Sequence, residues 1–371
     1  MNLFSSSSRI LAETYLIESF PLSDLLVDIV CEEEGPKATG IPELDAHFQT
    51  LNGSSFEWGS VIEIQGSPAS GKTHFLYYLI ATCVLPAEHG GWEKAAVLCD
   101  TDATFDPLRL RQVLVERLRP RNSQAALLSD TVLRPVLQRI HVFRPSSSNQ
   151  LAMTLAHLPN YHSSRLPNDE IGILAIDSLS AFHWSDRFTV EQLRATSDGS
   201  TSVTSPLRNV LKAIRRFRDS HRPIILLTNW GLTAIPHTPF FDQHLRSFPS
   251  PFADTPPQAV EPILPLTRHI TLARRTAVRL GEGIALEEAA EQERTARRPV
   301  MERGEITGLV RTPGHGGVGQ FTLCIGADGV HAAMRELQPS REPIVQNAPH
   351  LTKHRPSENA ATTIGAAMGC S

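Results

Sequence analysis

The sequence predicts an α/β protein with a largely parallel sheet flanked by helices and with antiparallel strands at the C-terminal edge. From Gly59 onward, short apolar runs alternate with amphipathic stretches, which is typical of parallel strands covered by helices. The later apolar runs are joined by a glycine-rich turn at Gly314–Gly319. The 371 residues are 41% hydrophobic and 20% charged, which allows one large core or two modest domains.

Each expected element has a local justification. Apolar runs predict parallel strands at Val61–Gln65, Ala95–Asp100, Arg139–Arg144, Gly172–Ile176 and Pro223–Thr228. Helical spacing of apolar residues predicts helices at Lys72–Val84, Leu108–Leu118 and Leu207–His221. Asp106 is a good cap for the second helix, and Pro107 suits its first turn. Antiparallel strands are expected at His269–Arg274, Glu305–Val310 and Gln320–Ile325.

Two long polar stretches interrupt this pattern. Pro236–Pro265 is rich in proline and has little periodicity, so it is either a functional loop or a disordered insert. Ser185–Ser205 is expected to be a similar loop. We expect an N-terminal extension at residues 1–38, a core domain at 39–335 and a disordered tail at 336–371.

Composition excludes several classes of protein. No run of eighteen apolar residues occurs, and the first twenty residues carry Glu13 and Glu18 rather than a basic segment, so membrane insertion and secretion are not expected. The five cysteines and 15 histidines lack ligand spacing, which argues against a zinc site or a disulfide framework. A net charge of -4 argues against coating nucleic acid by bulk electrostatics. Any DNA contact is therefore expected to be local or shared with a partner.

The strongest chemical signal is a phosphate-binding loop between the first strand and the first helix. The residues Gly66, Ser67, Pro68, Ala69, Ser70, Gly71, Lys72 and Thr73 fit the P-loop pattern. Such a loop turns backbone N–H groups toward phosphates, while Lys72 reaches the β- and γ-phosphates and the Thr73 hydroxyl binds Mg²⁺. The pattern predicts ATP and Mg²⁺ as cofactors. The alternative is an ordinary glycine-rich turn.

A P-loop also needs a second carboxylate for the metal, at the end of a buried strand. Asp177 directly follows the apolar run Ile173–Ile176, so it is the expected second metal residue, acting directly or through water. The alternative is an aspartate that caps the strand end.

The order of these motifs resembles RecA and its eukaryotic recombinase relatives, from about Thr39 to Val330. The resemblance rests on Thr39-Gly40-Ile41-Pro42-Glu43-Leu44-Asp45, the P-loop, Asp100-Thr101-Asp102-Ala103-Thr104-Phe105, Asp177-Ser178 and Ile325-Gly326-Ala327-Asp328-Gly329-Val330. It is similar above all to a recombinase paralogue, and it implies a RecA-like core. The sequence before Thr39 is too short for the helical N-terminal domain of the main recombinase.

The chain departs from the family at two positions. Where active members have a glutamate that activates the attacking water, this chain has Asp102, whose side chain is one methylene shorter. Where the family has a glutamine after Thr-Asn, which senses the γ-phosphate and links it to a DNA-binding loop, this chain has Trp230. The resemblance therefore implies nucleotide binding, with Asp102 as a weak candidate for catalysis.

The resemblance also implies that DNA meets Ser185–Ser205 and residues 233–265. The scattered candidates there are Arg187, Arg194, His237, His244 and Arg246, and two aromatic residues, Phe240 and Phe241. The aromatics could stack on bases or merely anchor a long loop. Arg208, Lys212, Arg215 and Arg222 form a basic face that is either a DNA contact or a solvated helix surface.

The function that follows is an ATP-binding recombinase paralogue in the nucleus, acting with little ATP hydrolysis as a subunit of a heteromeric complex for homologous-recombination repair. Its expected partners are another recombinase paralogue or the main recombinase, and single-stranded or branched DNA within the complex. The first alternative is a full ATP-driven strand-exchange recombinase. The second is an unrelated P-loop enzyme such as a kinase or a transporter ATPase.

Overall fold

The computed structural model describes residues 38–52, 56–119, 130–196, 204–250, 262–274 and 283–332. All of them belong to the first of two compact units, Met1–Ala333, and the second unit is Met334–Ser371. The expected tail and nearly all of the expected N-terminal extension therefore lie outside the described residues.

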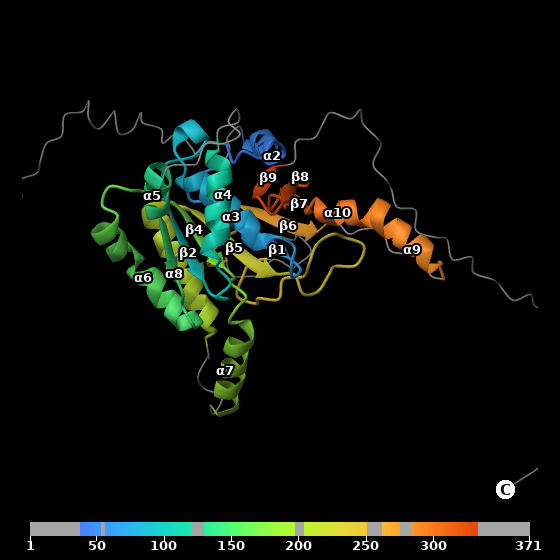
Figure 1. The fold of residues 1–371 in the computed structure, drawn as a ribbon. Coiled ribbons are helices and arrows are strands. Elements are labelled where there is room, and N and C mark those ends of the chain that lie inside the picture. Colours follow the sequence, from blue (N-terminus) through green and yellow to red (C-terminus); the bar gives the residue numbers. More distant parts are fainter. Residues whose placement is uncertain are drawn as a thin grey trace, which may run out of the picture. The chain divides into compact units, whose positions relative to one another are not determined.

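The described residues form one nine-stranded sheet in the order β3-β2-β4-β5-β1-β6-β7-β8-β9 (Figure 1). The strands are β1 (Val61–Gly66), β2 (Ala95–Asp100), β3 (Ile140–Phe143), β4 (Ile171–Asp177), β5 (Ile224–Trp230), β6 (Arg268–Arg274), β7 (Glu305–Arg311), β8 (Val318–Ile325) and β9 (Val330–Ala332). The predicted fold class is confirmed, because helices flank a mostly parallel sheet with antiparallel strands at its C-terminal end.

One strand direction needs correction. The strand predicted at His269–Arg274 pairs in parallel with β1 and antiparallel only with β7. Antiparallel pairing therefore begins one strand later than expected. Residues 231–267 between β5 and β6 are long enough to return the chain for a parallel pairing, as a crossover requires.

Helices cover both faces of the sheet. The helical elements are α2 (Pro42–Asn52), α3 (Lys72–Val84), η1 (Ala87–His89), α4 (Pro107–Leu118), α5 (Asp130–Gln138), α6 (Ser148–Arg165), α7 (His183–Thr196), α8 (Pro206–His221), α9 (Leu286–Gln292), η2 (Glu293–Arg297) and α10 (Arg298–Glu302). Helices α2, α3, α4 and α5 contribute to the hydrophobic cluster on one face. Helices α6 and α8 contribute to the cluster on the other.

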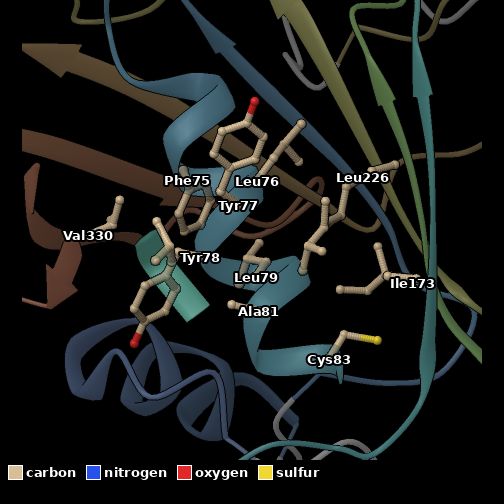
Figure 2. Packing of buried hydrophobic residues seen from close by; sticks show 14 of the residues in the cluster. Phe75, Leu76, Tyr77, Tyr78, Leu79, Ala81, Cys83, Ile173, Leu226 and Val330 are labelled. Atoms are coloured by element: carbon tan, nitrogen blue, oxygen red, sulfur yellow. The ribbon is translucent and has the colours of Figure 1, made fainter. Parts of the chain in front are cut away.

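The alternation of side chains along β1 separates these two clusters. Ile62 and Ile64 pack into the α3 cluster, whereas Val61 packs into the α8 cluster. Helix α3 is buried from Phe75 to Val84, and Figure 2 shows Leu79 and Cys83 lying toward Ile173 of β4. A helix buried along most of its length fixes the position of the loop that precedes it.

Polar contacts attach α2 to this core. Asp45 accepts hydrogen bonds from the Thr39 backbone N–H and hydroxyl, both at 2.8 Å, and from the Gly40 N–H at 3.1 Å. The Tyr78 hydroxyl of α3 donates to the Gly40 carbonyl at 3.0 Å. The Thr-Gly motif noted in the sequence is thus joined to α2 through Asp45 and to α3 through Tyr78.

The loop predicted at Ser185–Ser205 is wrong for its first part, which is helix α7. Residues 197–203 lie outside the described residues. Helix α7 extends away from the sheet (Figure 1), and most of its side chains are exposed, including Trp184 at 55% and Phe188 at 62%. A helix with no broad buried face lacks the apolar periodicity by which a helix is recognised in sequence.

The proline-rich Pro236–Pro265 stretch is partly built into the core. Leu245, Phe248 and Leu264 are buried against the α8 cluster. Residues 251–261 lie outside the described residues. The described parts of this stretch are therefore anchored to the sheet.

Candidate nucleotide-binding site

The predicted P-loop joins the end of β1 to the start of α3, and its backbone requires glycine at two places. Gly71 has a φ of +89°, and a Cβ there would lie 2.1 Å from Ile306 Cδ1. A Cβ on Gly66 would lie 2.6 Å from the Leu272 carbonyl oxygen. Ala69 also has a positive φ of 58°. This tight curl brings the loop back toward its own strand before the helix begins.

The start of α3 is open to an anion. Gly71 provides no side-chain cap, and the first turn has no acidic residue. The Ser70 hydroxyl is buried without a hydrogen-bond partner. Unsatisfied N–H groups at a helix start attract negative charge, so this end of α3 is suited to a phosphate.

Lys72 is held within the loop. Its Nζ donates to the carbonyl oxygens of Gly66 and Ser67, each at 2.9 Å. Burial lowers the pKa of Lys72, while the carboxylates of Asp177 and Asp102 oppose this change. The ammonium is thus placed over the loop, where a phosphate would replace its carbonyl partners.

Thr73 and Asp177, the two residues predicted to bind the metal, are in contact. The Thr73 hydroxyl donates to Asp177 Oδ2 at 2.8 Å, and the Thr228 hydroxyl donates to Asp177 Oδ1. Because the Thr73 proton points at Asp177, a lone pair on its oxygen is available to a cation. A hydroxyl oxygen beside a carboxylate is the hard-oxygen donor set that Mg²⁺ prefers, so these residues fit the ion.

A cavity of about 390 Å³ lies beside the loop, within the size range of ligand sites. Besides residues 69–73, it is lined by His74, Tyr77, Thr104, Asp106 and Arg109. None of these five residues was predicted from the sequence to belong to the site. Tyr77 could have been found, since it lies one helical turn beyond Thr73. Asp106 is the N-cap of α4 and Arg109 lies in its first turn, and their position beside the loop depends on the order of the strands in the sheet, where β4 and β5 separate β2 from β1.

The cavity wall is firmly held. Asp106 caps α4 by accepting from the N–H groups of Leu108 and Arg109, and the Asp106 N–H donates to the Tyr77 hydroxyl at 2.8 Å. The Arg109 guanidinium donates to the carbonyl oxygens of Gly326, Ala327 and Gly329. The turn between β8 and β9 is thereby tied to the start of α4.

Asp102, the weak catalytic candidate, lies near the phosphate end of the site with an exposed side chain. Desolvation raises the pKa of Asp102, as do the carboxylates of Asp177 and Asp100, and Lys72 opposes them. Asp100 itself is engaged elsewhere, because it accepts from the Thr104 N–H at 3.0 Å and from Arg144 Nε at 3.1 Å. Asp100 and Asp177 are buried, so Asp102 is the one of these three carboxylates that solvent reaches.

Trp230 stands beside the P-loop at the end of β5. It is in register with Gly66, and the Gly231 N–H donates to the Gly66 carbonyl at 2.9 Å. The backbone N–H of Trp230 donates to the Ser180 hydroxyl at 3.0 Å. The half-buried indole thus occupies the position where the resembled family has its glutamine, and its only polar side-chain group is an N–H donor.

The expected DNA residues do not form one basic surface. On α7, Arg187 pairs with Glu191 at 2.8 Å, and Arg194 is exposed. His237 and Arg246 are exposed, whereas the His244 ring packs against His183 at 5.0 Å between centroids. Burial lowers the pKa of His244 to about 4, with His183 adding to the effect.

The two aromatic candidates are anchoring residues in this conformation. The Arg311 guanidinium lies 3.4 Å from the centre of the Phe240 ring, and a Cβ on Gly231 would lie 2.7 Å from the Phe241 ring. The predicted basic face is exposed at Arg208, Lys212 and Arg215, while Arg222 is the C-cap of α8.

In the described part of the chain, no helix has the length and apolarity needed to cross a bilayer.

The strand order, with a P-loop directly after the central β1 and Asp177 at the end of β4, defines the class: this is an α/β protein of the P-loop type with a RecA-like core. The chain belongs to the Rad51 family, which matches residues 37–238, more than half of the 371 residues.

Similar proteins include two DNA repair proteins and a DNA repair and recombination protein. The chain is 33% identical to the DNA repair protein XRCC2 of Mus musculus over 174 residues, which are 47% of this chain and 57% of that protein. It is 26% identical to the XRCC2 homolog of Arabidopsis thaliana over 200 residues, 46% of this chain and 54% of the relative. The DNA repair and recombination protein RadA of Methanoculleus marisnigri is 28% identical over 194 residues, 52% and 54% of the two chains. The chain thus spans about half the length of the curated relatives it matches.

Proposed function

We propose that this protein binds Mg·ATP at Gly66–Thr73 and acts as a subunit of a heteromeric complex for homologous-recombination repair of DNA in the nucleus. The observation that carries the nucleotide part is the contact between Thr73 and Asp177 at 2.8 Å beneath an uncapped helix start. An ordinary glycine-rich turn would not require a buried carboxylate such as Asp177 in contact with the hydroxyl of Thr73.

The same geometry supports slow hydrolysis. Lys72 and Thr73 serve phosphate and metal in the ground state and the transition state alike, while activation of the attacking water matters only as the γ-phosphoryl group leaves. That task falls to Asp102, which is one methylene shorter than the glutamate of active relatives. The Trp230 side chain has no amide with which to sense the γ-phosphate, because its indole carries only an N–H donor. Nucleotide binding and turnover are therefore separate properties in this protein.

The role in repair rests on the relatives. Mouse XRCC2 is named a DNA repair protein, and RadA is named a DNA repair and recombination protein. The scattered basic residues of α7 and the 233–250 region favour shared DNA contact, with a partner supplying most of the phosphate neutralisation. The partner we propose is another recombinase paralogue or the main recombinase, and the DNA is single-stranded or branched.

The competing function is a full strand-exchange motor, which Asp102 and Trp230 both count against. A P-loop kinase or transporter ATPase is disfavoured by membership of the Rad51 family.

Turnover of ATP with and without single-stranded DNA distinguishes the adaptor from the motor. For the purified chain we expect slow hydrolysis that DNA raises little, because neither the water-activating carboxylate nor the sensing residue is optimal. Fast, strongly DNA-stimulated turnover would favour the motor.

Assembly tests the heteromeric part of the proposal. RecA-like cores bring nucleotide sites to boundaries between subunits, and we expect recovery from cells with a different recombinase paralogue. A long, regular homofilament of the pure protein on single-stranded DNA would contradict this expectation.

A further inference from the structure

A buried polar cluster lies on the opposite side of β1 from α3. Glu63 is fully buried in the middle of β1, and its Oε1 accepts from Asn229 Nδ2 and Gln243 Nε2, both at 2.8 Å. Its Oε2 faces His269 Nε2 at 3.7 Å. We call Glu63, Asn229, Gln243 and His269 the Glu63 cluster. A fully buried carboxylate is costly unless neighbouring donors stabilise it, and here they come from three separate segments.

The protonation of His269 follows from its neighbours. A guanidinium group can donate hydrogen bonds but cannot accept them. Arg311 NH2 therefore donates to His269 Nδ1 at 2.9 Å. Burial holds the pKa of His269 well below its usual value, so the ring is neutral and carries its proton on Nε2. His269 Nε2 lies 3.2 Å from Gln65 Oε1, to which it donates, and 3.7 Å from Glu63 Oε2.

One end of the cluster connects with the phosphate end of the nucleotide site. The Thr228 hydroxyl donates to Asp177, and the next residue, Asn229, donates to Glu63. The Ser180 hydroxyl donates to Asn229 Oδ1 at 3.0 Å, and the Leu179 N–H donates to the Thr228 carbonyl at 2.9 Å. Short contacts therefore join Asp177 to the end of β5.

The other end holds residues 231–250, which we call the 231–250 segment. Gln243 is its direct link to Glu63, and Gln65 Nε2 reaches the Asp242 carbonyl at 3.5 Å. Phe240 lies under the Arg311 guanidinium, and the same Arg311 contacts His269. The segment therefore rests on the polar cluster as well as on its own apolar anchors.

We infer that Glu63 is a positioning residue that couples nucleotide binding at Asp177 to the conformation of the 231–250 segment, through Asn229 on one side and Gln243 on the other. The inference rests on the proposed binding of Mg·ATP. The Glu63 cluster would connect the nucleotide site with the 231–250 segment in this chain, in which Trp230 cannot serve as the γ-phosphate sensor. A chain of contacts becomes a coupling only when a response at one end depends on its middle, and that dependence is measurable.

The experiment compares hydrogen exchange of backbone amides in the 231–250 segment with and without Mg·ATP, using the full chain. Nucleotide affinity is measured separately for each variant by calorimetry. In the unmodified protein we expect nucleotide to slow exchange in this segment by about fivefold. Gln243→Leu removes the donor to Glu63 and should abolish this change, while its Mg·ATP affinity stays within about twofold of the original.

Two further variants complete the design. Thr238→Val removes a local hydrogen bond to the Ile235 carbonyl and should keep the full nucleotide response. Glu63→Gln preserves the size of the side chain but removes its charge. It should reduce the response, and the double variant should behave like Gln243→Leu alone, because both act on one link.

The outcomes separate this inference from the proposed function. If the unmodified protein binds no Mg·ATP, both fail. If it binds Mg·ATP but exchange in the 231–250 segment does not change, or if Gln243→Leu keeps the full change, the coupling role of Glu63 is overturned and the nucleotide site stands.

Discussion

At the scale of single residues, the slow ATP hydrolysis that we propose is attributed to Asp102. It is exposed and near Lys72 and Asp177, whose charges act on it in opposite directions. Asp102→Glu lengthens the side chain toward a water and leaves the phosphate loop unchanged. We expect the hydrolysis rate to rise about tenfold or more with little change in Mg·ATP affinity, as measured by steady-state phosphate release.

Trp230 is the second residue in this proposal, and its expected effect is on the response of hydrolysis to DNA. If it interrupts the relay from γ-phosphate to DNA, activity rescued by Asp102→Glu should stay insensitive to single-stranded DNA until Trp230→Gln is added. Strong DNA stimulation of the Asp102→Glu variant alone would show that the indole does not interrupt this relay.

Glu63 should make stability depend on pH. Burial raises its pKa from 4.5 to about 7, against the opposing hydrogen bonds from Asn229 and Gln243. Between these two values the folded state binds more protons than the unfolded state, so the free energy of unfolding falls as pH rises from about 4.5 to 7. The loss is at most roughly 3 kcal/mol.

Glu63→Gln cannot titrate, so this contribution should be missing from it. Urea unfolding of both proteins between pH 5 and 8 should show the variant gaining stability relative to the unmodified chain as pH rises. A difference in unfolding free energy that is constant across this range would contradict the assignment.

At the scale of elements, regular segments were predictable and projecting or proline-containing ones were not. Helix α3 was expected at the bounds it has, because its apolar run and the preceding P-loop are both strong local signals. The helix α6 contains Pro159, and α7 projects with few buried side chains, so neither shows the usual sequence pattern. The direction of β6 depends on which strand the chain returns to, which no local pattern records.

The site divides in the same way. The loop and Asp177 were predictable because each lies where a buried strand ends. The cavity wall was not, because Asp106 and Arg109 reach it only once β2 and β1 are placed in one sheet. The Glu63 cluster also joins four segments that are far apart in sequence, and one glutamate in an apolar run gives little sign of it.

The cap of α4 is the element whose loss is easiest to measure. Asp106 accepts hydrogen bonds from two backbone N–H groups at 2.9 and 3.1 Å. Asp106→Ala should lower the free energy of unfolding by about 1 kcal/mol. Asp106→Ser retains a capping oxygen and should recover most of that loss, in parallel urea titrations. Equal losses in both variants would show that the capping bonds are not the cause.

At the scale of the whole molecule, the net charge leads us to expect weak DNA binding by the isolated chain. With a net charge of -4 and scattered arginines in the expected contact regions, few phosphates are neutralised. The isolated chain should bind single-stranded DNA weakly, with a logarithmic salt slope of about -1 to -2, as measured by fluorescence anisotropy at several salt concentrations. Tight binding at physiological salt with a steep slope would mean that the basic face of α8 or the 231–250 segment contributes more than proposed.

The central claim is that Gly66–Thr73 binds Mg·ATP through Lys72 and the Thr73–Asp177 pair. Its most direct test is a calorimetric titration of the purified full chain with Mg·ATP, alongside Lys72→Ala and the control Lys212→Ala on the exposed face of α8. We expect measurable affinity in the unmodified chain, unchanged affinity in Lys212→Ala and a loss of about tenfold to a hundredfold in Lys72→Ala. No binding by the unmodified chain, or equal binding by Lys72→Ala, would contradict the claim.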